Sequence, residues 1–287
     1  SIEGGHWFWS AALRYAYMIT LLMVLTPMTQ GPRALPRLLG VFCANWRFWT
    51  LAGSIGFGGF YSLICFSADH SPGWVIAATW QLTIIASLVV LMGFGRRFPK
   101  KIWLFSLIVF TGVLLINLSQ GEEIEIQALL LGALPVLVAA FCYPIGNQLV
   151  WEARNGNPHL PSITHPLADN PFNKVLLLSW GSVPFWVVLL LLIHPPPPTQ
   201  GQYINTALVA LFSGIIATGL FLMARTRART PSELAAVDAT QASEVVFALG
   251  AECLFLQIPP PNLVAGSGIV LVFLGLFFFI RFQEIRD

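Results

Sequence analysis

Nine apolar stretches, each long enough to cross a lipid bilayer, dominate this sequence. A membrane-spanning helix needs roughly 20 mostly apolar residues, because the hydrocarbon core of a bilayer is about 30 Å thick. Joints rich in Pro, Gly or charge separate the stretches. The expected spans are about 7–27, 49–68, 73–95, 102–118, 128–150, 173–193, 204–224, 233–256 and 263–281. We therefore expect an all-α integral membrane protein, a bundle of nine visible transmembrane helices.

Composition supports this class. Hydrophobic residues make up 56% of the chain and charged residues only 10%, whereas about a quarter of the residues in soluble domains are charged. The net charge of +2 is too small to favour a nucleic-acid partner, so the lipid bilayer is the expected surrounding. The four cysteines lie singly in apolar surroundings without metal-ligand spacing. We expect no metal and no cofactor.

The basic residues predict the orientation, because cytoplasmic loops carry an excess of Lys and Arg. When the joints are assigned to alternate sides, all of the 15 Lys and Arg except Arg14 fall on one side, and the acidic joint with Glu122 and Glu123 falls on the other. The chain is thus expected in the inner (plasma) membrane, starting outside and ending in the cytoplasm. The basic, amphipathic segment 35–46 is expected at the membrane interface.

An internal repeat is visible at low similarity. SPGWVIAATWQLT and the later segment 102–118 resemble TPSELAAVDATQAS and the segment 263–279, with Pro72 against Pro231. The second copy, 127–287, then has five helices and the first, 1–126, shows four, so we expect one further helix before Ser1. Copies with an odd number of crossings enter the membrane in opposite orientations, which places a substrate site near the midplane.

These features together resemble the drug/metabolite transporter superfamily. The features are the two helical copies and, in each, a pair of helices with a short joint whose second, apolar helix carries glycine. Two short sequence elements add to them: Gly4, Gly5, His6 and Trp7 open the first span, and Leu13, Arg14 and Tyr15 lie within it. The branch that the chain is most similar to is the multidrug-resistance efflux transporters. The resemblance implies ten helices in two inverted five-helix repeats and export of the substrate. This chain departs from that plan by lacking the first helix.

Ionisable groups inside the spans are the first candidates for function, because each costs about 3 kcal/mol or more in hydrocarbon. Asp238, Gln241 and Glu244 recur every third residue in the span 233–256, within an arc of roughly 120°. Glu244, near the middle of that span, could bind a proton or a cationic substrate but not both at once, which is the minimum needed for proton-coupled exchange. Alternatively, these groups hold the bundle together by hydrogen bonds between helices.

Arg14 lies near the midpoint of the first span, beside Tyr15 and Tyr17. It keeps its proton in any protein environment and must therefore meet an acceptor. One interpretation is a structural ion pair with Glu244 or Asp238. The other is a clamp on a carboxylate or phosphate of the substrate.

Two further spans carry polar groups. Trp80 and Gln81 lie near the middle of the third span, at the repeat position of Asp238 and Gln241. Tyr143 and Asn147 belong to a polar half of the fifth span that proline interrupts, which is typical of a gate or hinge. Glu152 and Glu252 lie near span ends and are expected at the interface.

The sequence contains no nucleotide-binding glycine loop, HExxH or GxSxG motif, so we expect no enzyme. The expected function is export of a small organic solute, a drug, organic cation or amino-acid-like metabolite, by a proton-coupled monomer or homodimer. The alternatives are an uncoupled or uptake carrier for a metabolite and a membrane scaffold without transport. The candidate binding residues are Glu244, Asp238, Gln241, Gln81, Trp80, Tyr143, Asn147, Arg14 and Tyr17.

Overall fold

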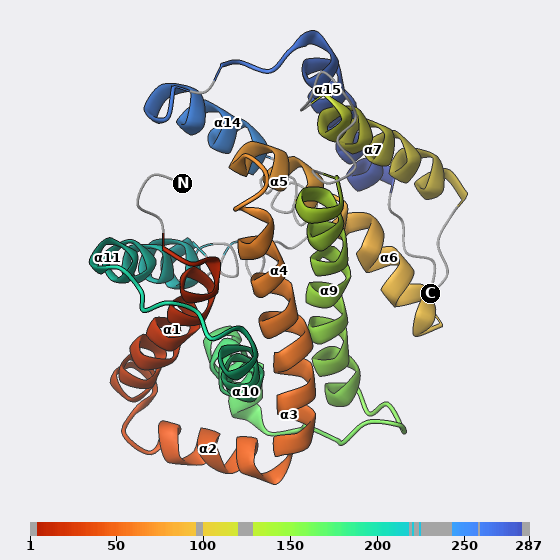
Figure 1. Ribbon diagram of the computed structural model, residues 1–287. Helices are drawn as coiled ribbons and strands as arrows, with labels where there is room; N and C mark the ends of the chain where they lie inside the picture. Colours follow the sequence, from red (N-terminus) through yellow and green to blue (C-terminus); the bar gives the residue numbers. More distant parts are fainter. Residues whose placement is uncertain are drawn as a thin grey trace. The chain divides into compact units, whose positions relative to one another are not determined.

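The computed structural model describes residues 5–95, 100–119, 129–217, 220, 224, 243–257 and 259–282. Within these ranges all regular structure is helical (Figure 1). In chain order the helices are α1 (Trp7–Gln30), α2 (Ala34–Ala44), α3 (Trp46–Gly53), the π-helix η1 (Ser54–Gly59), α4 (Phe60–Ser67), α5 (Gly73–Trp80), α6 (Thr83–Gly93), α7 (Lys100–Leu118), the π-helix η2 (Leu129–Ala133), α9 (Leu134–Arg154), the 3₁₀ helix η3 (Pro166–Asp169), α10 (Pro171–Ile193), α11 (Gln200–Val209), the π-helix η4 (Ala210–Ala217), α14 (Ser243–Phe255) and α15 (Leu263–Phe282).

Six helices of the described chain are long and apolar enough to cross a membrane. They are Trp7–Gln30, Trp46–Ser67, Gly73–Gly93, Leu130–Arg154, Pro171–Ile193 and Leu263–Phe282. Each overlaps one of the nine predicted spans, which confirms a helical protein with several membrane spans. Of the other three predictions, α7 covers 102–118, and α11 with η4 and α14 each cover part of theirs. The count of nine stays a prediction, because parts of 204–224 and 233–256 lie outside the described residues.

The amphipathic segment predicted between the first two spans forms α2. Its buried residues Ala34, Leu38 and Val41 recur at helical spacing and so share one face. Gly31 separates α1 from α2 with a φ of 89°, a conformation that favours glycine, while its N–H still bonds to Pro27 O. The chain can therefore turn from α1 into α2, which runs across to α3 (Figure 1).

The helices form two compact units, and each takes residues from both halves of the chain. Unit 1 comprises residues 1–65 and 142–223, and unit 2 comprises 66–141 and 224–287. The predicted copies 1–126 and 127–287 are therefore interleaved. Each contributes residues to both units, and the second copy contributes two separate segments to unit 2, 127–141 and 224–287. The copies themselves stay a prediction.

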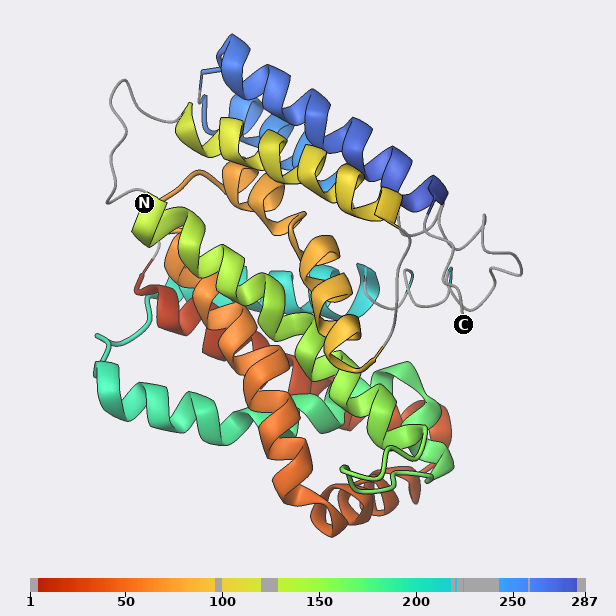
Figure 2. The ribbon, with the colours of Figure 1, turned by 90° about the vertical axis from the view of Figure 1, so that its right-hand side faces the viewer.

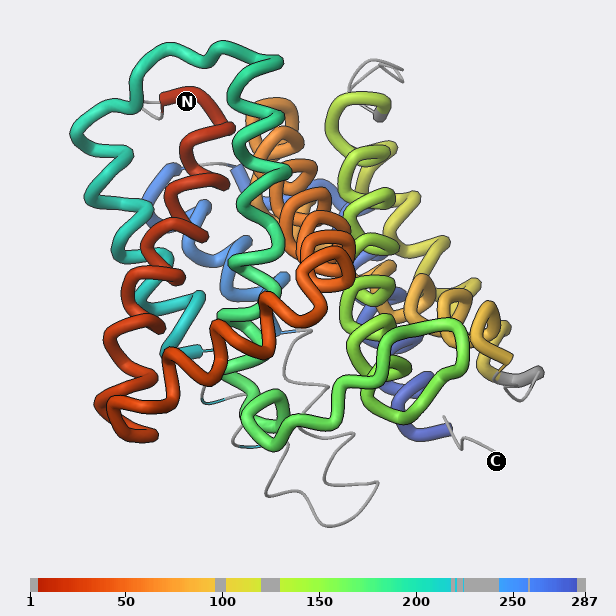
Figure 3. The backbone as a smooth tube through the Cα atoms, turned by 90° about the horizontal axis from the view of Figure 1, so that it is seen from below, coloured from red at the N-terminus to blue at the C-terminus, as the bar shows by residue number. Residues whose placement is uncertain are grey.

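In unit 1, α10 packs against α3 and η1, and α1 packs against α10, α11 and η4 (Figure 3). Glycine permits the contact between α3 and α10. A Cβ atom added at Gly53 would overlap Leu178 O, and one added at Gly181 would overlap Trp49 O. The two backbones thus approach as closely as small residues allow in membrane helix pairs. Trp49 and Leu178 are both buried in the core of this unit.

In unit 2, α7 and α15 lie side by side along most of their length (Figure 2). Gly112 and Gly268 face each other there, and a Cβ added at either would come within 2.6 Å of the carbonyl oxygen of the other. A second contact joins α5 to α14. The buried residues of α5, α7, α14 and α15 form one apolar cluster, which is the core of this unit.

We expect Gly181→Ala to destabilise the protein by on the order of 1–3 kcal/mol, because the new methyl group meets backbone that cannot rotate away. Thermal unfolding of the purified protein in detergent measures this loss. Gly201→Ala in α11 is the matched control, since no heavy atom lies within 4 Å of a Cβ added there. Equal melting temperatures for the two variants would contradict the close packing of α3 on α10.

Candidate functional site

Hydrogen bonds near both ends of α1 fix this helix within unit 1. Trp9 Nε1 donates to Pro196 O at 2.7 Å. At the other end, the side-chain amides of Gln30 and Asn173 donate to each other at 3.0 and 2.9 Å. Asn173 is fully buried and belongs to α10. The residues between the two ends of α1 therefore have a fixed position along α10 and η4.

Arg14 lies in the N-terminal half of α1, and its neighbours among the described residues are neutral. Its Cζ lies 4.2 Å from the centre of the Tyr61 ring, and its Nη2 donates to Ser213 Oγ at 3.5 Å. Its Nε is buried and has no hydrogen-bond partner among the described residues. Tyr15 and Cys65 also lie close enough to interact with its charge. Its described contacts are thus the ring and side-chain hydrogen bond of Tyr61, the long bond to Ser213 and the nearby Tyr15 and Cys65, all of them neutral groups.

Aromatic rings surround the next residue, Tyr15, which is only 4% exposed. Its ring stacks on Trp186 of α10 with centroids 5.6 Å apart. The rings of Phe57 and Tyr61 approach it at 5.3 and 5.8 Å. We call Arg14, Tyr15, Tyr61, Trp186 and Ser213 the Arg14 cluster; it joins α1, α4, α10 and η4 inside unit 1.

Two π-helices supply neighbours of this cluster. Phe57 lies in η1, Tyr61 follows that segment directly, and Ser213 lies in η4. In a π-helix the backbone hydrogen bonds span one residue more than in an α-helix, and such segments are frequent at functional sites. The helices that face Arg14 are therefore irregular at the level of the cluster.

A break in the third span lies at a predicted site residue. The span Gly73–Gly93 divides into α5 and α6, with Gln81 and Leu82 in the turn between them. Gln81 is 2% exposed, and its Nε2 donates to Ala77 O at 3.1 Å. Its amide thus serves the backbone at the break. Discontinuous helices of this kind border substrate sites in many transporters.

A side-chain hydrogen bond within unit 2 replaces the backbone hydrogen bond that the proline of α9 removes. Pro144 has no N–H to offer the carbonyl of Ala140, four residues before it. The hydroxyl of Thr83, the first residue of α6, donates to Ala140 O at 3.3 Å instead. A side chain from a neighbouring helix often satisfies a carbonyl freed by proline in membrane proteins. Thr83, just after the break at Gln81, thus satisfies a backbone carbonyl of α9 within unit 2.

The structure divides the predicted site residues between the two units. Arg14, Tyr17, Tyr143 and Asn147 belong to unit 1. Tyr143 is 40% exposed, and its ring lies 5.1 Å from that of Phe60; it is also near Tyr15. Asn147 is exposed and donates to Tyr143 O at 3.1 Å, while Tyr17 packs against the core.

Trp80, Gln81 and Glu244 belong to unit 2. Trp80 ends α5 and is half-buried, and Glu244 lies exposed in the first turn of α14. Asp238 and Gln241 lie outside the described residues. The ion pair of Arg14 with Glu244 or Asp238 therefore stays a prediction.

Glu252 has a role that the sequence did not indicate. Its Oε1 accepts the backbone N–H of Trp74 at the start of α5 at 3.1 Å. Its Oε2 is buried without a hydrogen-bond partner among the described residues. Gly73 makes room for this carboxylate, since a Cβ there would overlap Oε1. Glu252 thus caps the half-helix that leads to Gln81.

Sequence reasoning missed Tyr61, Ser213 and Trp186. A usable signal existed for Tyr61, because the chain has only 5 tyrosines, and a hydroxyl inside an apolar span needs a partner. Ser213 and Trp186 carry no comparable signal, since small polar and aromatic residues recur throughout the spans. Their position beside Arg14 follows only from the packing of α10 and η4 on α1.

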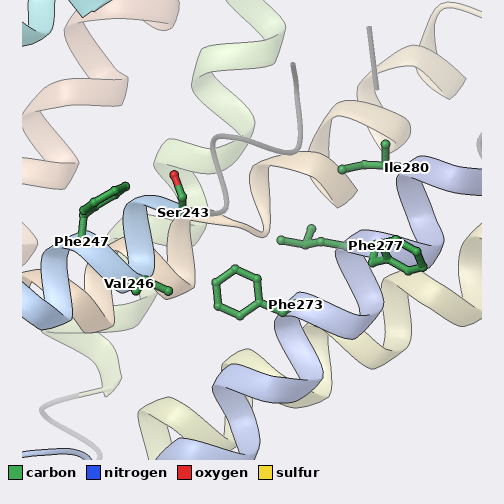
Figure 4. Close-up of a pocket in the computed structure, with 7 residues that line it drawn as sticks. Ser243, Val246, Phe247, Phe273, Phe277 and Ile280 are labelled. Carbon is green, nitrogen blue, oxygen red and sulfur yellow. The ribbon is translucent and has the colours of Figure 1, made fainter. Parts of the chain in front are cut away.

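A separate apolar pocket of about 370 Å³ lies in unit 2 between α14 and α15 (Figure 4). Among the described residues of its lining, Ser243 is the only polar one, beside Val246, Phe247, Phe273, Leu276, Phe277 and Ile280. Such a lining can accept hydrocarbon but offers no ionisable group for recognition. The Arg14 cluster is the better candidate for binding a polar solute.

An all-helical fold with six apolar helices and with charged and aromatic groups inside them defines a polytopic membrane protein. The family model described as EmrE, putative multidrug resistance efflux transporter, matches residues 1–285. The chain therefore belongs to this family, within the drug/metabolite transporter superfamily, as its resemblance predicted. This places it among transport proteins and not among enzymes.

Two curated relatives and one solved structure are similar to this chain. The "Uncharacterized protein YjlA" of Bacillus subtilis (strain 168) is 34% identical over 96% of this chain and 86% of its own length. The "Uncharacterized 42.1 kDa protein in intracellular alkaline protease 3'region" of Shouchella clausii is 34% identical over 85% of this chain and 64% of its own length. A solved chain described as "Crystal structure of protein" superposes with a TM-score of 0.61 at 13% identity, covering 96% of this chain and 89% of that chain. This last likeness supports the fold alone.

We expect Thr83→Val to destabilise the protein by about 1–2 kcal/mol, because it keeps the shape of the side chain but leaves Ala140 O without its donor. Thermal unfolding in detergent measures the effect. Thr111→Val is the matched control, because the Thr111 hydroxyl is exposed and donates to Leu107 O within its own helix. If both variants melt at the temperature of the wild type, the Thr83 hydroxyl does not stabilise the proline site.

Proposed function

We propose that this protein is a secondary transporter that exports a small organic solute in exchange for protons by alternating access. Family membership supports efflux as the direction. The observation that carries the proposal is the Arg14 cluster: a guanidinium against an aromatic ring inside an apolar helix, with a buried Nε that has no described hydrogen-bond partner. Such a charge inside a span is costly and is usually retained for binding or transport.

We further propose that the protein consists of two inverted repeats, because the helices of the two copies correspond in order and in their contacts. In chain order, α1, α3 to α4, α5 to α6 and α7 of the first copy would correspond to α10, α11 to η4, α14 and α15 of the second. The corresponding spans α3 to α4 and α11 to η4 each contain a π-helix, η1 and η4. Contacts within the units are reciprocal as well: α1 packs on α11 and α10 on α3, while α5 packs on α14 and α7 on α15. A two-fold relation between the copies would produce this pattern.

Glu244 is our candidate for proton coupling, with Asp238 and Gln241 beside it on the same predicted helix face. The binding cavity would include Gln81, Trp80, Tyr143, Asn147 and Tyr17. The orientation that we propose has the start of the chain outside and its end in the cytoplasm, in the inner membrane, as a monomer or homodimer. An uncoupled or uptake carrier for a metabolite is the alternative.

The proposal predicts proton flux driven by a solute gradient in proteoliposomes that contain the full-length protein. The solutes would be a panel of organic cations, amino acids and organic acids. We expect one class to give saturable flux. Because Glu244 is the proposed proton carrier, Glu244→Gln should lower this flux at least about tenfold by removing the exchangeable proton.

Asp69→Asn is the matched control, because Asp69 is an exposed acid of the same unit in the turn before α5. Its flux should equal that of the wild type. Flux that survives in Glu244→Gln would assign coupling to another group. Solute exchange without proton movement would favour the uncoupled carrier, and no movement of any solute would contradict transport.

A further inference from the structure

We infer that the transported solute carries a carboxylate on an apolar body, and that Arg14 binds this carboxylate; the inference rests on the transport function proposed above. The inference starts from the positive charge of Arg14, which some group must balance. A guanidinium keeps its proton in protein interiors. Inside an apolar span it therefore needs acceptors close by, and an anion is the strongest of these.

Acidic residues of unit 1 do not fill this role within the part of the chain that the structure describes. That part of unit 1 contains two acids, Glu152 and Asp169. Glu152 accepts hydrogen bonds from Gln148 at 2.9 Å and Asn157 at 3.0 Å, and Asp169 forms an ion pair with Arg154. Both are engaged near the end of α9, whereas the described partners of Arg14 are the neutral Tyr61 and Ser213.

The orientation of the guanidinium leaves one edge available. Tyr61 covers a flat face of the group and also forms a side-chain hydrogen bond with it that does not involve Nε. On the edge formed by Nε and Nη2, Nε is buried without a described partner, and the bond from Nη2 to Ser213 is long at 3.5 Å. Two parallel N–H groups on one edge of arginine match the two oxygens of a carboxylate.

The single charge of Arg14 and the aromatic rings near it limit the chemical class of the solute further. One guanidinium balances a single negative charge, whereas a phosphate ester carries about −1.5 to −2 and would leave excess charge in the span. The Tyr61 ring lies against the guanidinium. The rings of Phe57, Tyr61 and Trp186 surround the neighbouring Tyr15 at centroid distances of 5.3 to 5.8 Å. Such rings favour an apolar or aromatic body beside the carboxylate. The expected solute is thus an organic acid or a zwitterion with a hydrophobic part, and not a lipophilic cation.

The test uses three probes that share one body: 3-phenylpropionate, 3-phenylpropylamine and 3-phenylpropanol. Their exchange is measured in proteoliposomes with the full-length protein. We expect the acid to exchange saturably, and Arg14→Gln to weaken its apparent affinity about tenfold to hundredfold, the range for a charge-assisted pair. Arg14→Lys should give an intermediate loss, because it keeps the charge but lacks the two-pronged edge.

Arg47→Gln is the matched control. Arg47 is an exposed arginine of the same unit whose Cζ also lies over an aromatic ring, that of Trp46, at 5.4 Å. Exchange of the acid should be unchanged in this variant. An equal loss in Arg47→Gln and Arg14→Gln would attribute the effect to general electrostatics and overturn the inference.

The remaining outcomes separate this inference from the transport function. Exchange of the amine but not of the acid, unaffected by Arg14→Gln, would overturn the carboxylate and leave transport intact. If Arg14→Gln fails to fold and a second neutral change, Glu244→Gln or Asp238→Asn, restores it, Arg14 is the partner of a protein carboxylate and the inference is wrong. Loss for the acid alone in the folded Arg14→Lys variant would support it. Exchange of no probe, together with no flux across the wider panel, would overturn both.

Discussion

The requirement that every backbone polar group find a partner inside the protein governs this structure, because hydrocarbon offers none. Helices meet it by themselves, and the informative places are those where they do not. Pro144 frees the carbonyl of Ala140, and Thr83 of the neighbouring helix donates to it. The turn after α5 leaves Ala77 O to the amide of Gln81, and Glu252 accepts the N–H of Trp74 where α5 begins. Each of these three irregularities is therefore tied to a named polar side chain, which limits where the helices concerned can bend.

The sequence predicts the architecture well because the length of an apolar stretch is a direct physical measure of bilayer thickness. Six predicted spans and the helix α2 follow from this alone. The irregular segments could not be predicted. Both η1 and the turn at Gln81 lie within apolar stretches, and an apolar composition does not distinguish a regular α-helix from a π-helix or a turn. Arg14 was identifiable as a rare charge, and Tyr61 was accessible in principle. Ser213 was not, because its importance depends on which helix packs against α1.

Two kinds of polar residue in the spans now have different physical interpretations. Gln81, Thr83 and Glu252 serve the backbone, and their loss should first lower stability. Arg14 serves no backbone group among the described residues, since its described contacts are all with side chains, chiefly those of Tyr61 and Ser213. A polar group that contributes little to the fold in this way is the better candidate for recognising a solute. The carboxylates of the described unit 1 do the opposite, because both stabilise the end of α9.

The interleaving of the units bears on how the ribosome delivers this chain to the membrane. Unit 1 needs residues 142–223 and unit 2 needs residues 224–287, so neither can be complete while only the first half has been synthesised. Arg14 and Ser213 are 199 residues apart, and synthesis at about 5–20 residues per second separates them by roughly 10–40 seconds. During that time the first span must rest in the bilayer with a guanidinium that lacks its later neighbours. During early insertion, the guanidinium of Arg14 therefore needs another hydrogen-bond acceptor, such as a lipid phosphate or a group of the translocation machinery.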